Sequence, residues 1–508
     1  MKHSHKIIYP LGLLALQATA QAPDCPNIIV FLVDDMGWQD TSVPFHSERT
    51  KFNDTYETPN MERLAAQGMK FTQSYACAVS SPSRVSLLTG MNAARHRVTN
   101  WTLFKNQSTD RRSEVLSFPE WNVNGICQVD GIERTTAVTA LPQLLKNAGY
   151  HTIHCGKAHF GAINTPGESP YHLGFEVNIA GHAGGGLASY LGEKNFGNTP
   201  DGMRKHPQAI PGLEKYHGKD IFATEALTLE AISALDRAKK LGQPFFLYMA
   251  HYAIHIPVDK DKRFFQKYID KGLDPREAAY ASLIEGMDKS LGDLLNWLET
   301  NGEAQNTIVM FMSDNGGFSN GAQWRGGELF THNAPLRSGK GSAYEGGIRV
   351  PMIVKYPGKT AAASVCKQPV MIEDFFPSIL EMAGIKKPEI RQEVDGKSFV
   401  SLLEGKKMAQ RRSFFWHYPN LWDGTAPGVF PSSTILKGNM KLIYNYETGG
   451  KELYNLAVDL SETHNLANED PVLLKKLSKE LGQYLRKVKA QRPVIKATGK
   501  LAPWPDEI

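Results

Sequence analysis

The feature that most restricts the fold of this 508-residue chain is a set of four apolar runs that each end in charged or polar residues. The runs are NIIVFLVDDMG from residue 27, YHTIHCGKAHFG from residue 150, PFFLYMAHYAIHIP from residue 244 and NTIVMFMSDNGG from residue 306. Short runs rich in Ile, Val, Phe and Met, without polar alternation, are typical of strands buried on both faces. They predict a central sheet with no face exposed to solvent.

Helix-like stretches separate these runs and complete the predicted architecture. Segments such as PNMERLAAQGMKF, ALPQLLKNAGY, FATEALTLEAISALDRAKKLG and AAYASLIEGMDKSLGDLLNWLETNG carry apolar residues at three-to-four spacing. Strands that alternate with helices predict an α/β fold, a large mostly parallel sheet flanked by helices on both faces. Ligands of such sheets bind beyond the carboxyl ends of the strands, where the four runs place their polar residues.

The two ends of the chain differ from this central part. Residues 1–20 combine Lys2 and Lys6, the apolar segment IIYPLGLLAL and small residues before a cleavage point, which is typical of a secretory signal peptide. Its apolar part is too short for a stable membrane anchor, so we expect a periplasmic or secreted protein. After about residue 400, short strand-like runs and the amphipathic segment PVLLKKLSKELGQYLRKVKA predict a smaller α+β subdomain with a short antiparallel sheet and a helix, residues 401–508, beside a catalytic domain at 21–400.

Charge and cysteine content exclude some classes of function. The net charge of +5 is small for this length, and no Lys and Arg run of the kind that follows nucleic acid is present, so we expect no nucleic-acid partner. The five cysteines include no CxxC pair, which argues against a zinc knuckle or a disulfide scaffold. One or two disulfides in an exported protein stay open.

Two oxygen-rich pairs follow two of the predicted strands. Asp34 and Asp35 end the first run, and Asp314 and Asn315 end the fourth. An isolated Asp-Asp pair is more often a loop cap, but two such pairs at corresponding strand ends favour a hard cation between them. Oxygen ligands without nitrogen or sulfur suit Ca²⁺ or Mg²⁺ better than zinc, and we expect Ca²⁺.

The segment SSPSRVSLLTG, residues 80–90, has the features of an anion site. Pro82 suits the first turn of a helix and Ser80 or Ser81 its cap, so backbone amides and Arg84 would face a bound oxyanion. An ordinary capped helix is the simpler reading of the serines and proline alone. Lys157 and the glycine-flanked Lys340 could hold the same anion, and His159 and His255 could serve as acids or bases without a metal bond. Glu345 and Arg349 are expected to brace the Lys340 loop as an ion pair.

The whole segment from Ser80 to Gly90 resembles the modification motif of the type I sulfatases in the alkaline phosphatase superfamily. In that family a cysteine or serine at the first position is oxidised to formylglycine (3-oxoalanine), and the hydrate of formylglycine is the nucleophile. The resemblance therefore implies formylglycine at Ser80, made by a serine-type sulfatase-maturing enzyme that uses radical S-adenosylmethionine chemistry. An unmodified serine has only one hydroxyl, so it could not release the bound sulfate by the elimination that the second hydroxyl of the hydrate allows.

The resemblance extends through the other motifs to about residue 466 and implies roles for single residues. Asp34, Asp35, Asp314, Asn315 and modified Ser80 match the Ca²⁺ ligands, and Arg84, Lys157, His159, His255 and Lys340 match the groups that hold sulfate and move protons. Two positions depart from the common pattern, since Ala158 replaces a frequent tryptophan and Ile254 replaces a proline before His255. Neither departure removes a reacting group.

Loops beyond the strand ends are expected to select the substrate. The candidates are aromatic, basic or histidine side chains in four loops, and His251 at the end of the third apolar run. The loop candidates are His96, Arg97, Trp101, His182, Trp324, Arg325, His332, His417 and Trp422. Such side chains suit a sugar, and the resemblance implies a sulfated saccharide carrying galactose, N-acetylgalactosamine or glucosamine units. Two alternatives stay open: a phosphoester hydrolase of the same superfamily, and a non-catalytic glycan-binding protein with unmodified Ser80.

Overall fold

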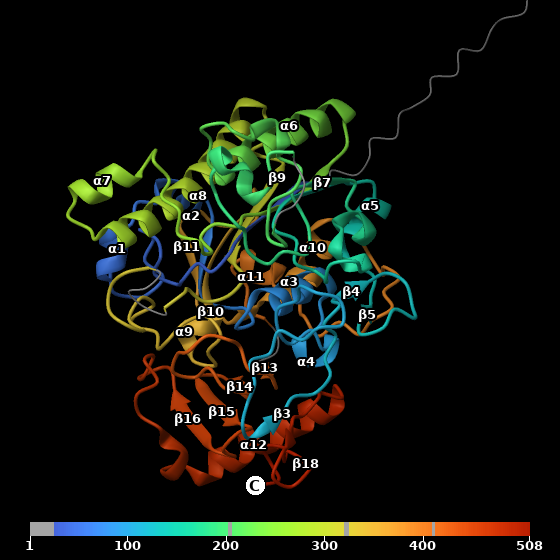
Figure 1. The fold of residues 1–508 in the computed structure, drawn as a ribbon, viewed down its shortest axis with the longest axis vertical. Coiled ribbons are helices and arrows are strands. Elements are labelled where there is room, and N and C mark those ends of the chain that lie inside the picture. Colours follow the sequence, from blue (N-terminus) through green and yellow to red (C-terminus); the bar gives the residue numbers. More distant parts are fainter. Residues whose placement is uncertain (1–24, 202–205, 320–324, 409–411) are drawn as a thin grey trace, which may run out of the picture.

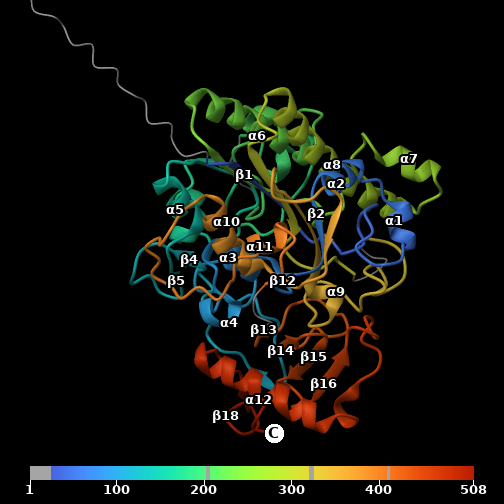
Figure 2. The same cartoon turned by 180° about the vertical axis from the view of Figure 1, so that it is seen from behind.

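The computed structural model describes residues 25–201, 206–319, 325–408 and 412–508. The predicted signal peptide at 1–20 and the candidate Trp324 lie outside these described residues. Figure 1 shows a large α/β body above a smaller C-terminal sheet, and Figure 2 shows the same arrangement from behind.

A nine-stranded mixed sheet forms the centre of the molecule, in the order β11-β2-β10-β9-β1-β8-β6-β7, with β12 also paired to β2. The strands are β1 (Asn27–Val33), β2 (Met69–Tyr75), β6 (His151–Gly156), β7 (Val177–Ile179), β8 (Phe245–Ala250), β9 (Thr307–Ser313), β10 (Arg349–Lys355), β11 (Ser364–Cys366) and β12 (Val370–Met371). Every pair is parallel except the two made by β10, with β2 and β9. The predicted mostly parallel α/β sheet is confirmed.

Helices cover both faces of this sheet, as the unbroken apolar runs require. Along β1, Ile29, Phe31 and Val33 pack into one apolar core, whereas Ile28, Val30 and Leu32 pack into the other. The first core is shared with α2 (Pro59–Gln67), α6 (Ala223–Leu241) and α8 (Pro275–Thr300), and the second with α3 (Ser80–Thr89), α5 (Leu141–Asn147) and α10 (Phe375–Met382). Successive side chains of one strand therefore stabilise two separate layers.

The C-terminal part forms a separate antiparallel sheet, drawn in orange and red in Figure 1. Its strands are β13 (Ser413–Tyr418), β14 (Ser432–Lys437), β15 (Met440–Asn445) and β16 (Lys451–Asn455), and α12 (Pro471–Lys487) packs on it through Leu477, Leu481 and Leu485. A second small sheet pairs β17 (Val494–Ile495) with β18 (Lys500–Leu501) and with β3 (Leu116–Ser117). The last residues of the chain are thus joined to a loop of its first quarter.

The remaining elements are short. In the part of the chain that the structure describes they are α1 (Lys51–Thr55), α4 (Ala93–His96), α7 (Phe265–Asp270), α9 (Glu345–Ile348), α11 (Val400–Leu403), the paired strands β4 (Ile126–Cys127) and β5 (Thr136–Ala137), and six 3₁₀ turns. Within the described residues no helix is both long and apolar enough to cross a membrane. All five cysteines are free thiols, so neither of the disulfides left open by the sequence forms here.

Three local expectations differ from the structure. The segment PNMERLAAQGMKF is helical only to Gln67, because Met69 already begins β2. Helix α8 begins at Pro275, earlier than the apolar pattern suggests, because the side chain of Asp274 accepts a hydrogen bond from the amide of Arg276. Helix α3 is capped by the extended residue Val79 rather than by Ser80 or Ser81, whose side chains face other partners.

Candidate active site

The polar strand ends converge on one edge of the central sheet. Asp34 follows β1, Lys157 follows β6 and Asp314 follows β9. The amide of Asp34 donates to the carbonyl oxygen of Ala253 at 2.9 Å, and the amide of Asp314 donates to that of Val33 at 3.0 Å. Because neighbouring parallel strands end together, side chains from distant parts of the chain meet here.

Three carboxylates form a buried cluster at this edge. One carboxylate oxygen from each of Asp34, Asp35 and Asp314 lies within 4.8 Å of the others. Asn315 donates to Asp35 Oδ1 at 2.9 Å, and Asp34 Oδ2 is buried without a hydrogen bond from any described residue. Burial raises the pKa of Asp34 to about 8, with Asp314 and Asp35 adding to the rise while Lys157 and Arg84 oppose it. An oxygen-only donor set with an unsatisfied buried oxygen fits a hard divalent cation.

Ser80, the first residue of α3, lies directly against this cluster. Its hydroxyl is 3.1 Å from both Asp34 Oδ1 and Asn315 Oδ1, and it accepts a hydrogen bond from Lys157 Nζ at 3.0 Å. The side chain is buried at the N-terminus of a ten-residue helix, where the helix dipole and free amides favour negative charge. The position suits an oxygen that carries or contacts an anion.

Two fully buried cations, Arg84 and Lys157, offset the negative charge of the carboxylates. Arg84 Nε donates to Asp314 Oδ2 at 2.9 Å, and Arg84 Nη1 donates to the carbonyl oxygen of Lys157 at 2.9 Å. Lys157 Nζ donates to Asp34 Oδ1 at 2.7 Å. Burial lowers the pKa of Lys157 to about 8 although Asp34 opposes the change, so the ammonium group depends on its acidic neighbour.

Lys340 and His255 lie near Ser80, and both are close to the carboxylate of Asp35. Lys340 Nζ lies 2.7 Å from Asp35 Oδ1 and 2.8 Å from Oδ2, and His255 Nε2 lies 3.7 Å from Asp35 Oδ2. Burial opposes a charged Lys340, yet Asp35 holds the pKa of Lys340 above its ordinary value. Burial, with Lys340 adding to it, lowers the pKa of His255 to about 3, so this imidazole is neutral.

The loop that carries Lys340 is tied to the smaller sheet. Glu345 lies 3.3 Å from Arg349, the ion pair expected from the sequence, and 2.9 Å from Lys441 of β15. Lys441 also contacts Glu462 at 2.8 Å, and neither Glu345 nor Lys441 is exposed. The C-terminal sheet therefore helps to fix the position of an active-site lysine.

His159 is held on the opposite wall by its backbone and by close packing. Its φ is +59°, and Nε2 lies 2.9 Å from the carbonyl oxygen of Thr102. A Cβ at Gly185 would lie 2.3 Å from the His159 ring, so only glycine fits beside it. Burial lowers the pKa of His159 well below its ordinary range, with Lys157 and Arg84 adding to the effect.

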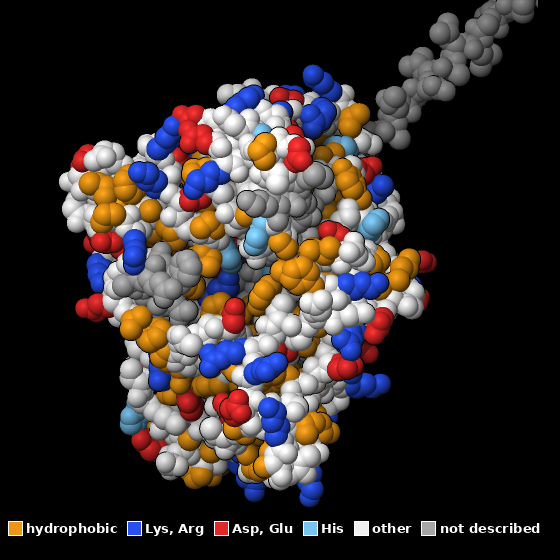
Figure 3. Space-filling model, in the orientation of Figure 1, with side chains coloured by type: hydrophobic (Ala, Val, Ile, Leu, Met, Phe, Trp, Pro, Cys, Tyr) orange, Lys and Arg blue, Asp and Glu red, His pale blue; other side chains and the backbone are white. Residues whose placement is uncertain are grey.

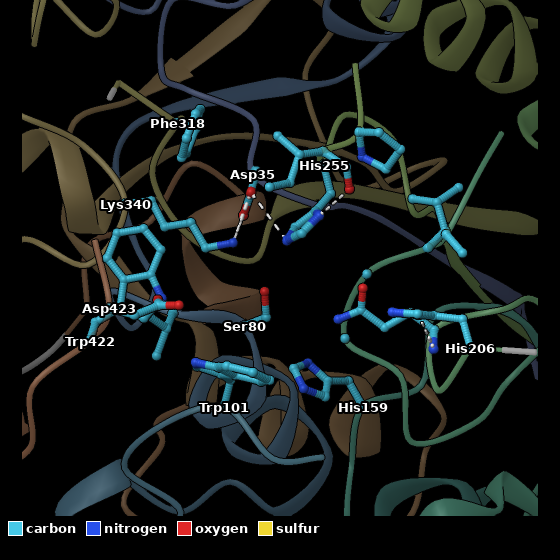
Figure 4. A pocket seen from close by; sticks show the side chains of 18 residues that line it. Asp35, Ser80, Trp101, His159, His206, His255, Phe318, Lys340, Trp422 and Asp423 are labelled. Carbon is cyan, nitrogen blue, oxygen red and sulfur yellow. Dashed lines mark hydrogen bonds and ion pairs between the residues drawn. The ribbon is translucent and has the colours of Figure 1, made fainter. Parts of the chain in front are cut away.

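These groups open into a pocket of about 460 Å³. The residues that line it include Asp35, Ser80, Trp101, His159, His206, Gln208, His255, Phe318, Lys340, Trp422 and Asp423. Figure 3 shows a hollow near the middle of this face, with histidine and basic side chains inside it and hydrophobic side chains along its edge. Figure 4 places Ser80 at the centre, between Trp101 and His159 on one side and Asp35 and His255 on the other. Of the candidates for substrate contact, the structure brings Trp101 and Trp422 to this pocket.

Four of the candidate histidines are structural and lie outside the pocket lining. His96 is bonded to Ser86 Oγ at 3.0 Å, His251 to Ser290 Oγ at 2.8 Å, and His417 to Ser433 Oγ at 2.8 Å. His332 faces the carbonyl oxygen of Gly326 at 2.7 Å. All four are buried, which corrects the expectation that they contact substrate.

His182 and the two candidate arginines also have other roles. His182 is buried, and its Nδ1 accepts from the amide of Gly184 at 2.9 Å. Arg97 donates to the carbonyl oxygen of Lys489 at 2.7 Å. Arg325 is fully buried, pairs with Asp40 and donates to the hydroxyl of Tyr56 at 2.8 Å. None of the three lines the pocket, which corrects their expected substrate contacts.

Several pocket residues have no clear signal in the sequence. His206 and Gln208 stand in a loop without a motif, and Phe318 directly follows the motif that ends at Gly317. Asp423 follows Trp422 in a segment expected to belong to a separate subdomain. Trp422 was a candidate for sugar contact together with Trp101, and this is the sign in the sequence that its segment faces the pocket.

Comparisons with known proteins agree with this site. The family model described as Sulfatase matches residues 26–385, and one described as N-sulphoglucosamine sulphohydrolase, C-terminal, matches residues 339–491. A sulfatase from Formosa agariphila is 33% identical over 99% of this chain and 97% of its own length. Human N-acetylgalactosamine-6-sulfatase is 31% identical over 80% of this chain and 75% of its own length.

Two solved structures resemble the fold over nearly the whole chain. The crystal structure of Ps i-CgsB in complex with k-i-k-neocarrahexaose has a TM-score of 0.70 and 26% identity, covering 91% of this chain and 92% of that one. A structure from work on glycosaminoglycan metabolism by Bacteroides thetaiotaomicron, BT33336S-sulf, has a TM-score of 0.66 and 26% identity, covering 92% of this chain and 100% of that one. With the family model and the relatives, they show that this chain belongs to the sulfatase family and is a sulfuric ester hydrolase.

Proposed function

We propose that this chain is an exported carbohydrate sulfatase that acts through formylglycine made from Ser80. Its substrates would be glycan or glycosaminoglycan sugars, such as sulfated galactose, N-acetylgalactosamine or glucosamine. The observation that carries the proposal is the Ser80 hydroxyl, 3.0 Å from Lys157 Nζ, in a pocket whose outer lining includes Trp101 and Trp422. A charged inner end suits sulfate, and aromatic rings beside it suit a sugar.

The names of the relatives support a carbohydrate substrate. They include N-acetylgalactosamine-6-sulfatases of several mammals and a structure solved with a neocarrahexaose. The choice among sugars rests on this likeness and on the shape and chemistry of the pocket.

The carboxylate cluster would hold Ca²⁺ through Asp34, Asp35, Asp314 and Asn315, with position 80 beside it. When bound, Ca²⁺ and formylglycine would supply a polarised, acidified nucleophilic oxygen in place of the serine hydroxyl. The chain's own cations would neutralise the sulfuryl oxygens, since Lys157 and Lys340 lie on two sides of Ser80 and Arg84 lies behind it.

Proton movement falls to Lys340 and the two histidines. His255 Nδ1 lies 2.7 Å from the carbonyl oxygen of Ile256, which leaves Nε2 toward Asp35 and the pocket. Because Nδ1 faces a carbonyl oxygen, the neutral ring carries its proton there and Nε2 is free to accept one. The charged Lys340 would supply a proton, which Nε2 would pass on to the leaving sugar oxygen. His159 Nε2 faces Thr102, so Nδ1, which has no hydrogen bond among the described residues, is the atom that can accept a proton.

Two measurements on protein produced beside a serine-type sulfatase-maturing enzyme test the proposal. Mass spectrometry of the tryptic peptide from Phe71 to Arg84 should show a mass two hydrogens below the encoded one, localised to Ser80. The same protein should hydrolyse members of a panel of defined sulfated sugars, with Ser80→Ala as the inactive control. Turnover of aryl sulfates alone, or faster turnover of phosphate esters, would overturn the carbohydrate assignment.

Export is tested separately. If residues 1–20 are a signal peptide, the mature protein recovered outside the cytoplasm should begin near residue 21. Full-length protein retained in the cytoplasm of the native host would contradict the proposal.

A further inference from the structure

We propose that Asp423 is a specificity-determining residue that restricts this sulfatase to sugars whose scissile sulfate is their only anionic group near the reacting ring. The inference rests on the proposed carbohydrate function and names the charge state of the preferred substrate. It concerns the outer part of the pocket, formed by Trp101, Trp422 and Asp423, where Figure 4 shows Trp422 and Asp423 side by side near Lys340.

The segment before Asp423 is anchored to the large domain. Asn420 is fully buried, and its side chain bonds to Thr99 Oγ1 at 2.5 Å and to Asp110 Oδ2 at 2.9 Å. The carbonyl oxygen of Leu421 accepts from the amide of Arg111 at 2.9 Å. These bonds cross more than 300 residues of sequence, so the segment is fixed to the pocket wall rather than to its own subdomain alone.

The packing of the Trp422 indole fixes the position of the next residue, Asp423. A Cβ at Gly341 would lie 2.2 Å from Trp422 Cε3, and one at Gly424 would lie 2.0 Å from Trp422 Cζ3. The indole therefore occupies space that only two glycines leave free, with Lys340 Nζ 5.7 Å from its ring centroid. Because the indole is held between these contacts, the following residue has a defined place at the pocket.

Asp423 brings an uncompensated negative charge to that place. The Asp, Glu, Lys and Arg residues among the described residues that line the pocket are Asp35, Lys340 and Asp423. Asp35 and Lys340 pair with each other at 2.7 Å, whereas Asp423 is exposed and has no cation of the described chain within 4.0 Å. The other polar side chains in the outer lining are Gln208 and His206.

This distribution separates substrates by charge. A sugar bound by its sulfate at Ser80 would present its remaining groups to Trp101, Trp422 and Asp423. A hydroxyl or acetamide N–H can donate to the carboxylate, but a second sulfate or a uronate would be repelled by it. The pocket therefore suits neutral, singly sulfated galactose or N-acetylhexosamine units better than multiply sulfated or acidic ones.

The test compares N-acetylgalactosamine 6-sulfate with N-acetylgalactosamine 4,6-disulfate. We expect wild-type kcat/KM to favour the monosulfate, and Asp423→Asn to reduce that preference by about 5- to 10-fold. Asp423→Glu should keep the preference, and about 1 M salt should reduce it in the wild type, because screening removes a charge effect but not a steric one. Glu114→Gln, which removes an exposed carboxylate outside the pocket, should change nothing.

A binding measurement separates this inference from the function it rests on. Calorimetric titration of Ser80→Ala protein with the same two sugars reports their relative Kd without turnover. An unchanged Kd ratio and an unchanged kcat/KM ratio in Asp423→Asn, or a wild type that prefers the disulfate, would overturn the role of Asp423 while leaving the sulfatase intact. Modified wild-type protein that neither binds nor cleaves any sulfated sugar would overturn the carbohydrate function and this inference together.

Discussion

The inner and outer halves of the pocket are built in opposite ways. Around Ser80, each charged side chain contacts an oppositely charged neighbour, as in the contacts of Lys157 with Asp34 and Lys340 with Asp35. At the outer edge, Trp101, Trp422 and Asp423 come from loops and few polar bonds join their side chains to the protein. The inner half is suited to one shared reaction with a sulfate group, whereas the outer half is free to differ with the substrate.

The largest effect is expected at the centre of the inner half. Ser80→Ala should lower kcat on every sulfate ester by at least about 10⁴-fold, because no other described side chain at the cluster offers a comparable oxygen. The free energy of unfolding should fall by about 1 to 3 kcal/mol, since the buried hydroxyl contacts Asp34, Asn315 and Lys157. Initial rates and thermal unfolding check both parts, and residual activity near the wild-type level would contradict the assignment.

Removal of the cation should have the next largest effect on the inner half. Arg84, Lys157 and Lys340 offset only part of the repulsion among three carboxylates within 4.8 Å, and Asp34 Oδ2 has no hydrogen bond among the described residues. Treatment with a chelator should therefore abolish activity and lower Tm. Ligand at a hundredfold excess over Kd adds about 2.7 kcal/mol to the free energy of unfolding, which sets the scale of the change. Ca²⁺ should restore both activity and Tm better than Mg²⁺ or Zn²⁺. Activity that survives exhaustive chelation would argue against a metal at this cluster.

A change in the outer half should affect binding rather than chemistry. Trp422→Ala removes an aromatic wall, so KM for a sulfated sugar should rise by about 10-fold while kcat changes little. Trp422→Phe should keep most of the affinity and serves as the matched control. A large fall in kcat with unchanged KM would mean that Trp422 contributes to the chemical step rather than to binding of the sugar.

These two halves also differ in how far the sequence predicts them. Asp34, Asp314, Lys157 and His255 each follow an apolar run, and parallel strands of one sheet end at a common edge, so their meeting could be foreseen. His96, His251 and Arg325 are of the same chemical types, but the sequence does not show that Ser86, Ser290 and Asp40 occupy their polar atoms. Asp423 depends on a tertiary contact between two parts of the chain, which no local pattern encodes.

The smallest predicted effect concerns the histidines that were expected at the pocket and are in the core. Burial lowers the pKa of His96 to about 3, below its value of about 6.5 in the unfolded chain. The unfolded state therefore binds the proton more readily, so the contribution of His96 to stability is complete above pH 6.5 and is lost as pH falls toward 3. Between pH 7.5 and pH 5.5, the free energy of unfolding should fall by about 1 kcal/mol for this group.

Urea unfolding at a series of pH values checks this prediction. His96→Gln should be less stable at neutral pH but should lose about 1 kcal/mol less than the wild type on the same acid shift. Identical pH slopes in the two proteins would show that His96 is protonated equally in the folded and unfolded states.

The join between β3 and β17, together with the anchored segment at Asn420, has a consequence for synthesis of the protein. Ser80 and Trp101 leave the ribosome early, Asp314 and Lys340 follow later, and Trp422 and Asp423 emerge only near the end of translation. Until Trp422 and Asp423 have packed against the earlier part of the chain, the pocket around Ser80 lacks part of its outer wall, so we expect discrimination among sugars to require the completed C-terminal part.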